Sequence, residues 1–168
     1  MRKTSILTLA VAAVAALSVG AYTAFATSGA HFFSTSSSVN SSGALVVNWD
    51  EAGVGQDQVN YTLTADATAL YACLNNGGHN PSAANKQSFA GSVSGGGTFN
   101  PTNGRVRPGG LTAGPLQEPS FTCPHGQTRV LAQVTYTNIV LTDTTNNVFA
   151  NVPNASNCFY PNIPDLCT

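Results

Sequence analysis

The most constraining feature of this sequence is the alternation of apolar and polar residues from Val59 to Cys73. Every odd position in this segment is apolar, and every even position up to Thr68 is polar. A period of two is typical of a β-strand with one buried and one solvated face. Beyond Thr68 the even positions also become apolar, at Leu70, Ala72 and Leu74. The segment therefore predicts a long strand that starts half-exposed and ends buried on both faces.

A shorter strand is expected before this segment. In Ala44–Asp50 the side chains of Leu45, Val47 and Trp49 fall on one face, and the single tryptophan is expected to anchor the core. The segment Glu51–Asp57 contains three glycine or alanine residues and two acidic ends, so it is expected to be a solvated turn.

Glycines divide the middle of the chain. Phe89–Ser94 predicts a short strand that ends at three consecutive glycines, residues 95–97. The Asn103-Gly104 pair that follows is a strong signal for a tight turn.

A second long strand is expected over Thr128–Leu141. Its hydrophobic phase changes between Tyr136 and Ile139, which predicts a β-bulge near Thr137-Asn138. The residues expected to share one face before this bulge are Val130, Ala132, Val134 and Tyr136.

The chain begins with the three parts of a secretory signal peptide. Arg2 and Lys3 form a positive end, residues 6–19 form an apolar run, and Ala24-Phe25-Ala26 offers a cleavage site, with Ala30 as an alternative end. The apolar run is shorter than the roughly 20 residues that a membrane-spanning helix needs, and no later run reaches that length. We therefore expect a secreted protein, extracellular or associated with the cell wall, with no membrane span after signal removal.

The strands and turns predict the organisation of the whole chain. Seven or eight antiparallel strands, without helical periodicity after the signal, are typical of an all-β, immunoglobulin-like sandwich. The expected parts are a signal peptide over 1–26, a Ser-rich arm or edge strand over 27–43, a sandwich over 44–153 and a disulfide-clasped tail over 154–168.

Four cysteines suit an oxidising compartment. An even number in an exported chain favours disulfides, and four cysteines allow three pairings. We favour Cys158 with Cys167 as a local clasp and Cys73 with Cys123 as a long-range link. No C-x-x-C spacing supports a metal site instead.

Net charge excludes one class of partner. Without residues 1–26 the chain has four basic and seven acidic side chains, a net charge of −3. Binding to nucleic acid depends on a basic patch, so no nucleic-acid partner is expected. The four basic residues are Lys86, Arg105, Arg107 and Arg129.

Several different short motifs lie along the chain between His31 and Pro153. Together they resemble small secreted actinobacterial β-rich proteins, and this resemblance implies a compact exported β domain without implying any activity. The tail after Pro153 is then an addition to the pattern, which supports pairing its two cysteines with each other. The motifs are Ala30-His31-Phe32, Glu51–Gly55, Tyr71–Gly78, Pro81, Asn85-Lys86, Cys123–Gln127, Tyr136–Asn138 and Thr142–Asn146.

Copper is the main alternative chemistry. If cleavage follows Ala30, the mature chain starts at His31, and its amine and imidazole could chelate Cu(II) with His79 or His125 as a third nitrogen ligand. No other cofactor is expected.

Catalysis finds little support in the sequence. There is no Gly-x-Ser-x-Gly motif, and nothing brings two carboxylates together for glycoside cleavage. We therefore expect no enzyme. A second alternative is an extracellular protease inhibitor, because the loop after Cys73 is similar to that of the bacterial subtilisin-inhibitor family, although no second cysteine closes it here.

The favoured hypothesis is a structural or binding module. Its loops, Asn75–Lys86 and Pro101–Gly110, or an exposed sheet edge would contact a cell-wall, glycan or protein surface. The segment His31–Phe33 is a candidate for strand exchange. The candidate binding residues in the loops are Asn75, Asn76, His79, Asn80, Lys86, Arg105 and Arg107.

Overall fold

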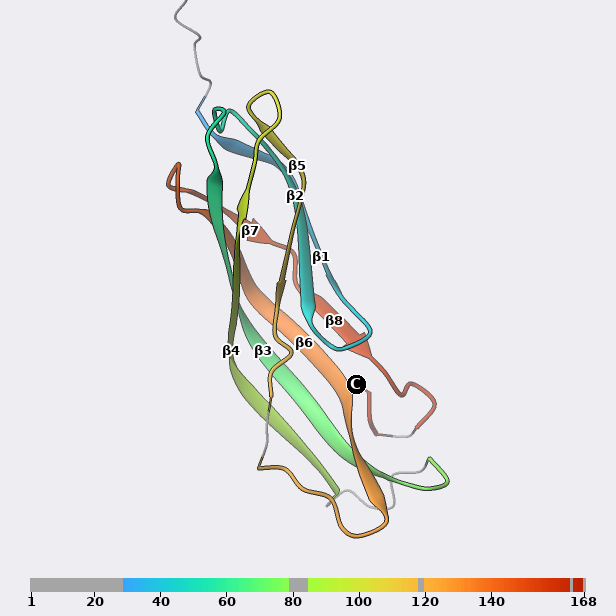
Figure 1. Ribbon diagram of the computed structural model, residues 1–168. Coiled ribbons are helices and arrows are strands. Elements are labelled where there is room, and N and C mark those ends of the chain that lie inside the picture. The colour runs from blue at the N-terminus through green and yellow to red at the C-terminus, as the bar shows by residue number, and fades with distance from the viewer. Residues whose placement is uncertain (1–28, 79–84, 118–119, 164, 168) are drawn as a thin grey trace, which may run out of the picture.

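A computed structural model describes residues 29–78, 85–117, 120–163 and 165–167 of the chain. Those residues form two antiparallel sheets packed face to face (Figure 1). The predicted signal peptide, residues 1–26, lies outside the described part. The strands are β1 (His31–Val39), β2 (Leu45–Ala52), β3 (Val59–Asn75), β4 (Lys86–Phe99), β5 (Arg105–Ala113), β6 (Gln127–Asp143), β7 (Val148–Val152) and β8 (Ala155–Cys158).

The strand order confirms the predicted immunoglobulin-like sandwich. One sheet has the order β1-β2-β5, and the other has the order β4-β3-β6-β7, with β8 also paired to β6. In immunoglobulin lettering these are strands A-B-E facing C′-C-F-G. Within the described residues no helix is long and apolar enough to cross a membrane.

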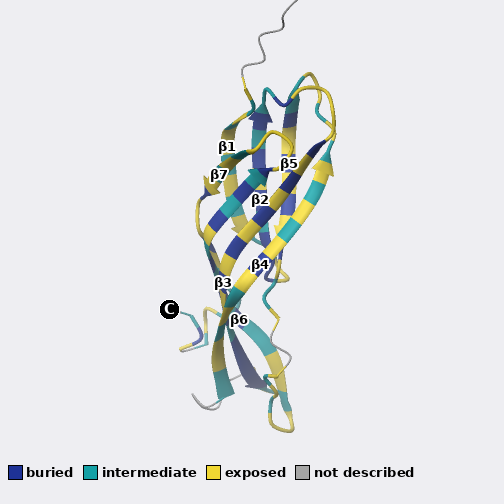
Figure 2. Cartoon of the chain, turned by 90° about the vertical axis from the view of Figure 1, so that its left-hand side faces the viewer, coloured by how far each residue is buried: buried dark blue, intermediate teal, exposed yellow. Residues whose placement is uncertain are grey.

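β3 is the centre of the larger sheet, as its alternation predicts. It pairs with β4 on one side and with β6 on the other. Its odd residues from Val59 to Tyr71 are buried between the sheets, and its even residues up to Thr68 are exposed. Figure 2 shows these alternating buried and exposed bands along the strand.

β6 contains two irregularities, of which the sequence predicted one. The register against β3 shifts opposite Ala65, where Asn138 has a φ of 49°, so the bulge expected at Thr137-Asn138 is confirmed. The register against β3 shifts a second time near Leu131, and the side-chain phase of β6 reverses again there. Val134 and Tyr136 therefore face the main core, whereas Val130 and Ala132 contact a second cluster. The prediction that all four share one face is wrong, because a bulge reverses the side-chain phase.

β4 is longer than predicted and does not stop at its glycines. It continues through residues 95–97 to Phe99. A Cβ at Gly95 would overlap the carbonyl oxygen of Thr112 in β5, and one at Gly97 would crowd Leu111. These glycines permit the close approach of the two sheets where the chain crosses from β4 to β5, rather than ending the strand.

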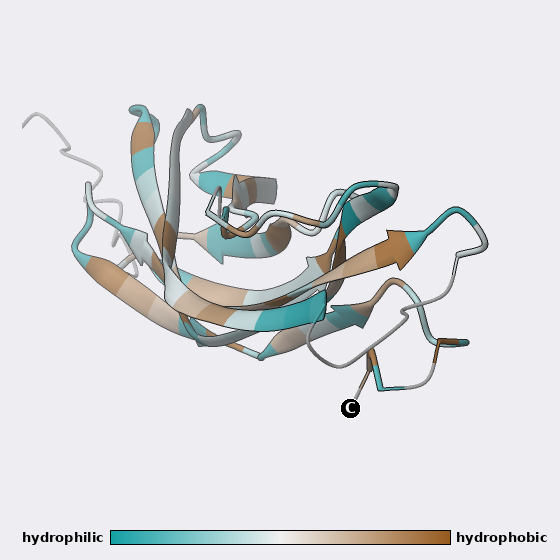
Figure 3. Cartoon of the chain, turned by 90° about the horizontal axis from the view of Figure 1, so that it is seen from below, coloured by the Kyte–Doolittle hydropathy of each residue, from teal (hydrophilic) through white to brown (hydrophobic). Residues whose placement is uncertain are grey.

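Both ends of the described chain contribute strands beyond the predicted span 44–153. β1 is an edge strand of the smaller sheet, and β8 pairs with residues 133–136 of β6. The segment after β8 places Leu166 over Ala72 and Leu74, on the outer face of the larger sheet. This cover explains why the even positions of β3 become apolar after Thr68. In Figure 3 hydrophobic and hydrophilic residues are interspersed along the strands of both layers.

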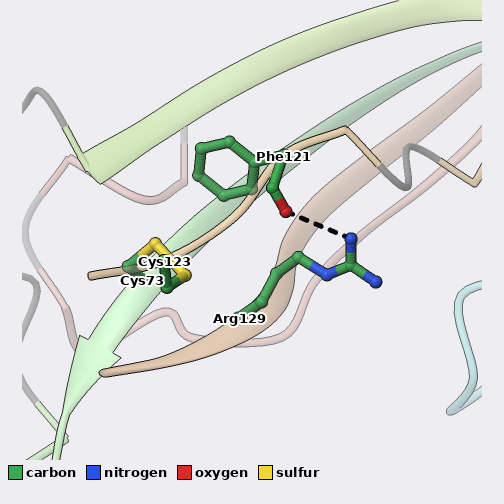
Figure 4. The surroundings of a disulfide bond; sticks show 4 residues. All are labelled: Cys73, Phe121, Cys123 and Arg129. Carbon is green, nitrogen blue, oxygen red and sulfur yellow. Dashed lines mark hydrogen bonds between the residues drawn. A yellow bond between two sulfur atoms is a disulfide. The ribbon is translucent and has the colours of Figure 1, made fainter. Parts of the chain in front are cut away.

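All four cysteines form the disulfides that the sequence favoured, Cys73–Cys123 and Cys158–Cys167. Beside the first, the Arg129 guanidinium donates a hydrogen bond to the Phe121 carbonyl oxygen, at 3.2 Å (Figure 4). Its Cζ also lies 5.6 Å from the centre of the Tyr71 ring. These contacts fix the connection between β5 and β6 against the end of β3.

Candidate functional site

The outer face of the three-stranded sheet carries a cluster of charged side chains. Arg105 on β5 donates two hydrogen bonds to the Asp50 carboxylate on β2, from Nε at 2.6 Å and from Nη2 at 2.5 Å. The Nε atom of Arg107 lies 3.4 Å from the same carboxylate. The hydrogen bonds from Arg105 hold the pKa of Asp50 below its usual value, so this carboxylate is ionised.

An exposed aromatic ring lies next to this cluster. The β1–β2 register shifts between Phe32 and Ser34, and the Phe33 side chain between them is 60% exposed. The Arg105 Cζ lies 5.0 Å from the centre of the Phe33 ring, within cation–π distance. We call Phe33, Asp50, Arg105 and Arg107 the arginine–aromatic face. Beside the charged residues of this face, a shallow depression is bordered by Ser34, Ser36, Asn48 and Pro108.

A second polar group lies beneath the same sheet, inside the core. Glu51 and Asp143 are both fully buried. Asp143 accepts hydrogen bonds from the backbone N–H groups of Thr145 and Asn146, whereas neither oxygen of Glu51 has a hydrogen-bond partner of good geometry. Burial raises the pKa of Glu51 to about 7, and the negative charge of Asp143 acts in the same direction.

The buried carboxyls show what sequence reasoning missed. Glu51 was expected in a solvated turn, but β2 continues through Ala52 and carries Glu51 into the core. The two-residue alternation of β2 could have predicted the burial of Glu51, because Glu51 continues the inward phase of Leu45, Val47 and Trp49. Asp143 likewise continues the inward phase of β6 after its bulge.

Two of the three predicted copper ligands, His31 and His125, lie in the described residues, at opposite ends of the sandwich. His31 begins β1 and pairs with Ala52, and its Nδ1 lies 2.9 Å from the Gly29 carbonyl oxygen. His125 precedes Gln127, which pairs with Asn75 at the opposite end of the larger sheet (Figure 1). His79 lies outside the described residues. The described residues contain no cluster of three or more potential metal ligands.

The predicted binding residues fall into two separate groups. Asn75, Asn76 and Lys86 lie where β3 ends and β4 begins, and the Lys86 Nζ donates a hydrogen bond to the Asp165 carbonyl oxygen at 2.8 Å. Arg105 and Arg107 lie at the other end, on strand β5 rather than in the loop expected over 101–110. Asn80 and most of the loop behind the protease-inhibitor alternative, residues 79–84, are outside the described part.

Comparison of the chain with family models, with curated proteins and with solved structures finds no match. The site is therefore interpreted from its own geometry.

Proposed function

We propose that this chain is an exported, non-catalytic binding module whose ligand surface is the arginine–aromatic face. The observation that carries this proposal is the gathering of two of the four basic residues beyond residue 26 beside an exposed phenyl ring. The rest of the chain is poor in charge, so this cluster stands out electrostatically. Export is supported by the signal-like N-terminus, by two disulfides and by the resemblance to small secreted proteins.

The chemistry of the face favours a carboxylate-bearing glycan. The Arg107 side chain remains 67% exposed beside Asp50, which leaves guanidinium donors for a ligand. A planar guanidinium matches the two oxygens of a carboxylate. The exposed Phe33 ring offers a flat apolar surface for the C–H face of a sugar. An acidic polysaccharide of the cell envelope presents both groups together.

No catalytic step is proposed for this face. Asp50 is engaged by Arg105 and is held ionised, so it is a poor proton donor. The two carboxyls with unusual surroundings, Glu51 and Asp143, are fully buried beneath the sheet and have no access to a ligand. The face is suited to holding an anion rather than to transforming it.

Binding to immobilised acidic and neutral glycans tests the proposal. We expect the wild-type chain to bind uronate-containing polymers, and Arg107→Ala and Phe33→Ala each to weaken binding at least tenfold. Lys86→Ala and Phe149→Ala are matched controls, because they remove a distant cation and a second exposed ring. Equal binding to neutral and acidic glycans, or equal loss in the control variants, contradicts the proposal.

A further inference from the structure

β4 is an open edge of the five-stranded sheet. Within the described residues it pairs only with β3, and all 14 of its residues are in continuous register from Lys86 to Phe99 without a bulge. The side of β4 that faces away from β3 therefore presents unpaired backbone N–H and C=O groups. Such a row is a template for pairing with another strand.

The other edges in the described structure are protected. β5 carries Arg105, Arg107 and Pro108, and its register against β2 is interrupted. β1 contains a bulge, and its Ser37 Oγ donates a hydrogen bond to the Pro153 carbonyl oxygen between β7 and β8. β7 and β8 have only five and four residues. Charge, proline, bulges and short length are the usual means of preventing edge pairing.

β4 has none of these protections. From Gln87 to Phe99 it contains no charged residue and no proline. Its outward side chains are small or polar, so they would not obstruct an approaching backbone. Because it pairs with β3 without irregularity, it is also regular enough to accept a long ladder on its free side.

We propose that β4 is a homodimerisation edge, at which β4 of one copy pairs antiparallel with β4 of a second copy about a two-fold axis. An isologous contact requires a self-complementary surface, and an uncharged edge meets itself without repulsion. The only charged residue of β4 is Lys86, at one end. Antiparallel pairing places the two Lys86 side chains at opposite ends of the ribbon, roughly 40 Å apart. That separation is several Debye lengths at physiological salt, so the two charges do not oppose pairing.

The β4 edge is separate from the proposed ligand surface. The arginine–aromatic face belongs to the smaller sheet, and pairing at β4 extends the larger one. The dimer would present two ligand faces on one rigid body, which raises avidity for a repeating polymer.

The oligomeric state of the secreted chain tests the proposal. We expect light scattering after gel filtration to give the mass of a dimer, and Ala90→Lys/Ser94→Lys to give a monomer. The control is Thr68→Lys/Thr64→Lys, which adds the same charge at the register partners of these residues on β3. All four positions are exposed, so both variants should fold, and the control should remain a dimer.

Hydrogen exchange on the wild-type chain provides a test that needs no variant. We expect amides within residues 86–99 to exchange more slowly as protein concentration rises, with no such change in β5. A wild-type chain that is monomeric at every concentration overturns the proposal. A dimer that persists in the Ala90→Lys/Ser94→Lys variant overturns it as well, because the contact then lies on another surface.

Discussion

At the scale of single residues, Glu51 is the least expected feature of the core. It occupies an inward-facing position of β2, as Leu45, Val47 and Trp49 do, but its side chain carries a carboxyl group. Its neighbours are Tyr61, whose pKa is also raised by burial, and the Asp143 carboxylate. A buried carboxyl without good hydrogen bonds is more stable in its neutral form.

This environment predicts that stability falls as pH rises. The pKa of Glu51 is about 7 in the folded chain and about 4.5 when unfolded, so its contribution is present below pH 4.5 and is lost as pH rises to about 7. We expect Glu51→Gln, which is neutral throughout, to lose less stability over this range than the wild-type chain. Urea unfolding at several pH values measures both. A difference between the two chains that does not change with pH would contradict the assignment.

At the scale of elements, features that depend on alternation within one strand were predicted from the sequence, whereas features that depend on contacts between strands were not. The strand over 59–73, the inward face of β2 and the bulge at Asn138 followed from the order of residues within one strand. The second bulge in β6 and the extension of β4 did not follow from the order of residues. Each depends on residues of a neighbouring strand: β3 for the bulge and β5 for the extension. The same limit applies to the candidate site. Arg105 and Arg107 were predicted as candidate binding residues, but their convergence on Asp50 depends on the register between β5 and β2.

The two disulfides are expected to stabilise the sandwich unequally. Cys73 and Cys123 are 50 residues apart, and Cys158 and Cys167 are nine apart. In the chain-entropy model these loops contribute about 4 and about 2.6 kcal/mol, respectively. We expect Cys73→Ser/Cys123→Ser to lower the free energy of unfolding more than Cys158→Ser/Cys167→Ser does, as measured by denaturant unfolding. The reverse order would mean that the tail's packing around Leu166 depends on its clasp more than loop entropy indicates.

At the scale of the whole molecule, the edge strands of the two sheets approach each other along both sides of the sandwich. On one side β1 approaches β7 and β8, and the Ser37 hydroxyl donates a hydrogen bond to the Pro153 carbonyl oxygen across the gap between the sheets. On the other side the edges β4 and β5 belong to different sheets, are joined by the turn at Asn103-Gly104 and lie so close that a Cβ at Gly95 would overlap the Thr112 carbonyl oxygen. The long strands β3 and β6 lie between these sides, and β3 pairs along most of its length with both β4 and β6.

Protection from hydrogen exchange should follow this arrangement. We expect the slowest amides in β3 and β6, because these strands are paired on both sides along much of their length. The fastest strand amides are expected in β1, at the edge of the smaller sheet. Exchange measured by mass spectrometry tests this order, and uniform protection across the strands would indicate that the sheets open only together.

The placement of the cross-links has a consequence for binding. Both disulfides lie in the half of the sandwich where β3 ends and the tail packs around Leu166. The half that carries Phe33 and Arg105 is held by noncovalent contacts alone, so transient opening should begin there. A ligand seated on that half would therefore suppress the weakest fluctuation of the molecule, and saturation would raise its melting temperature even though no covalent bond changes.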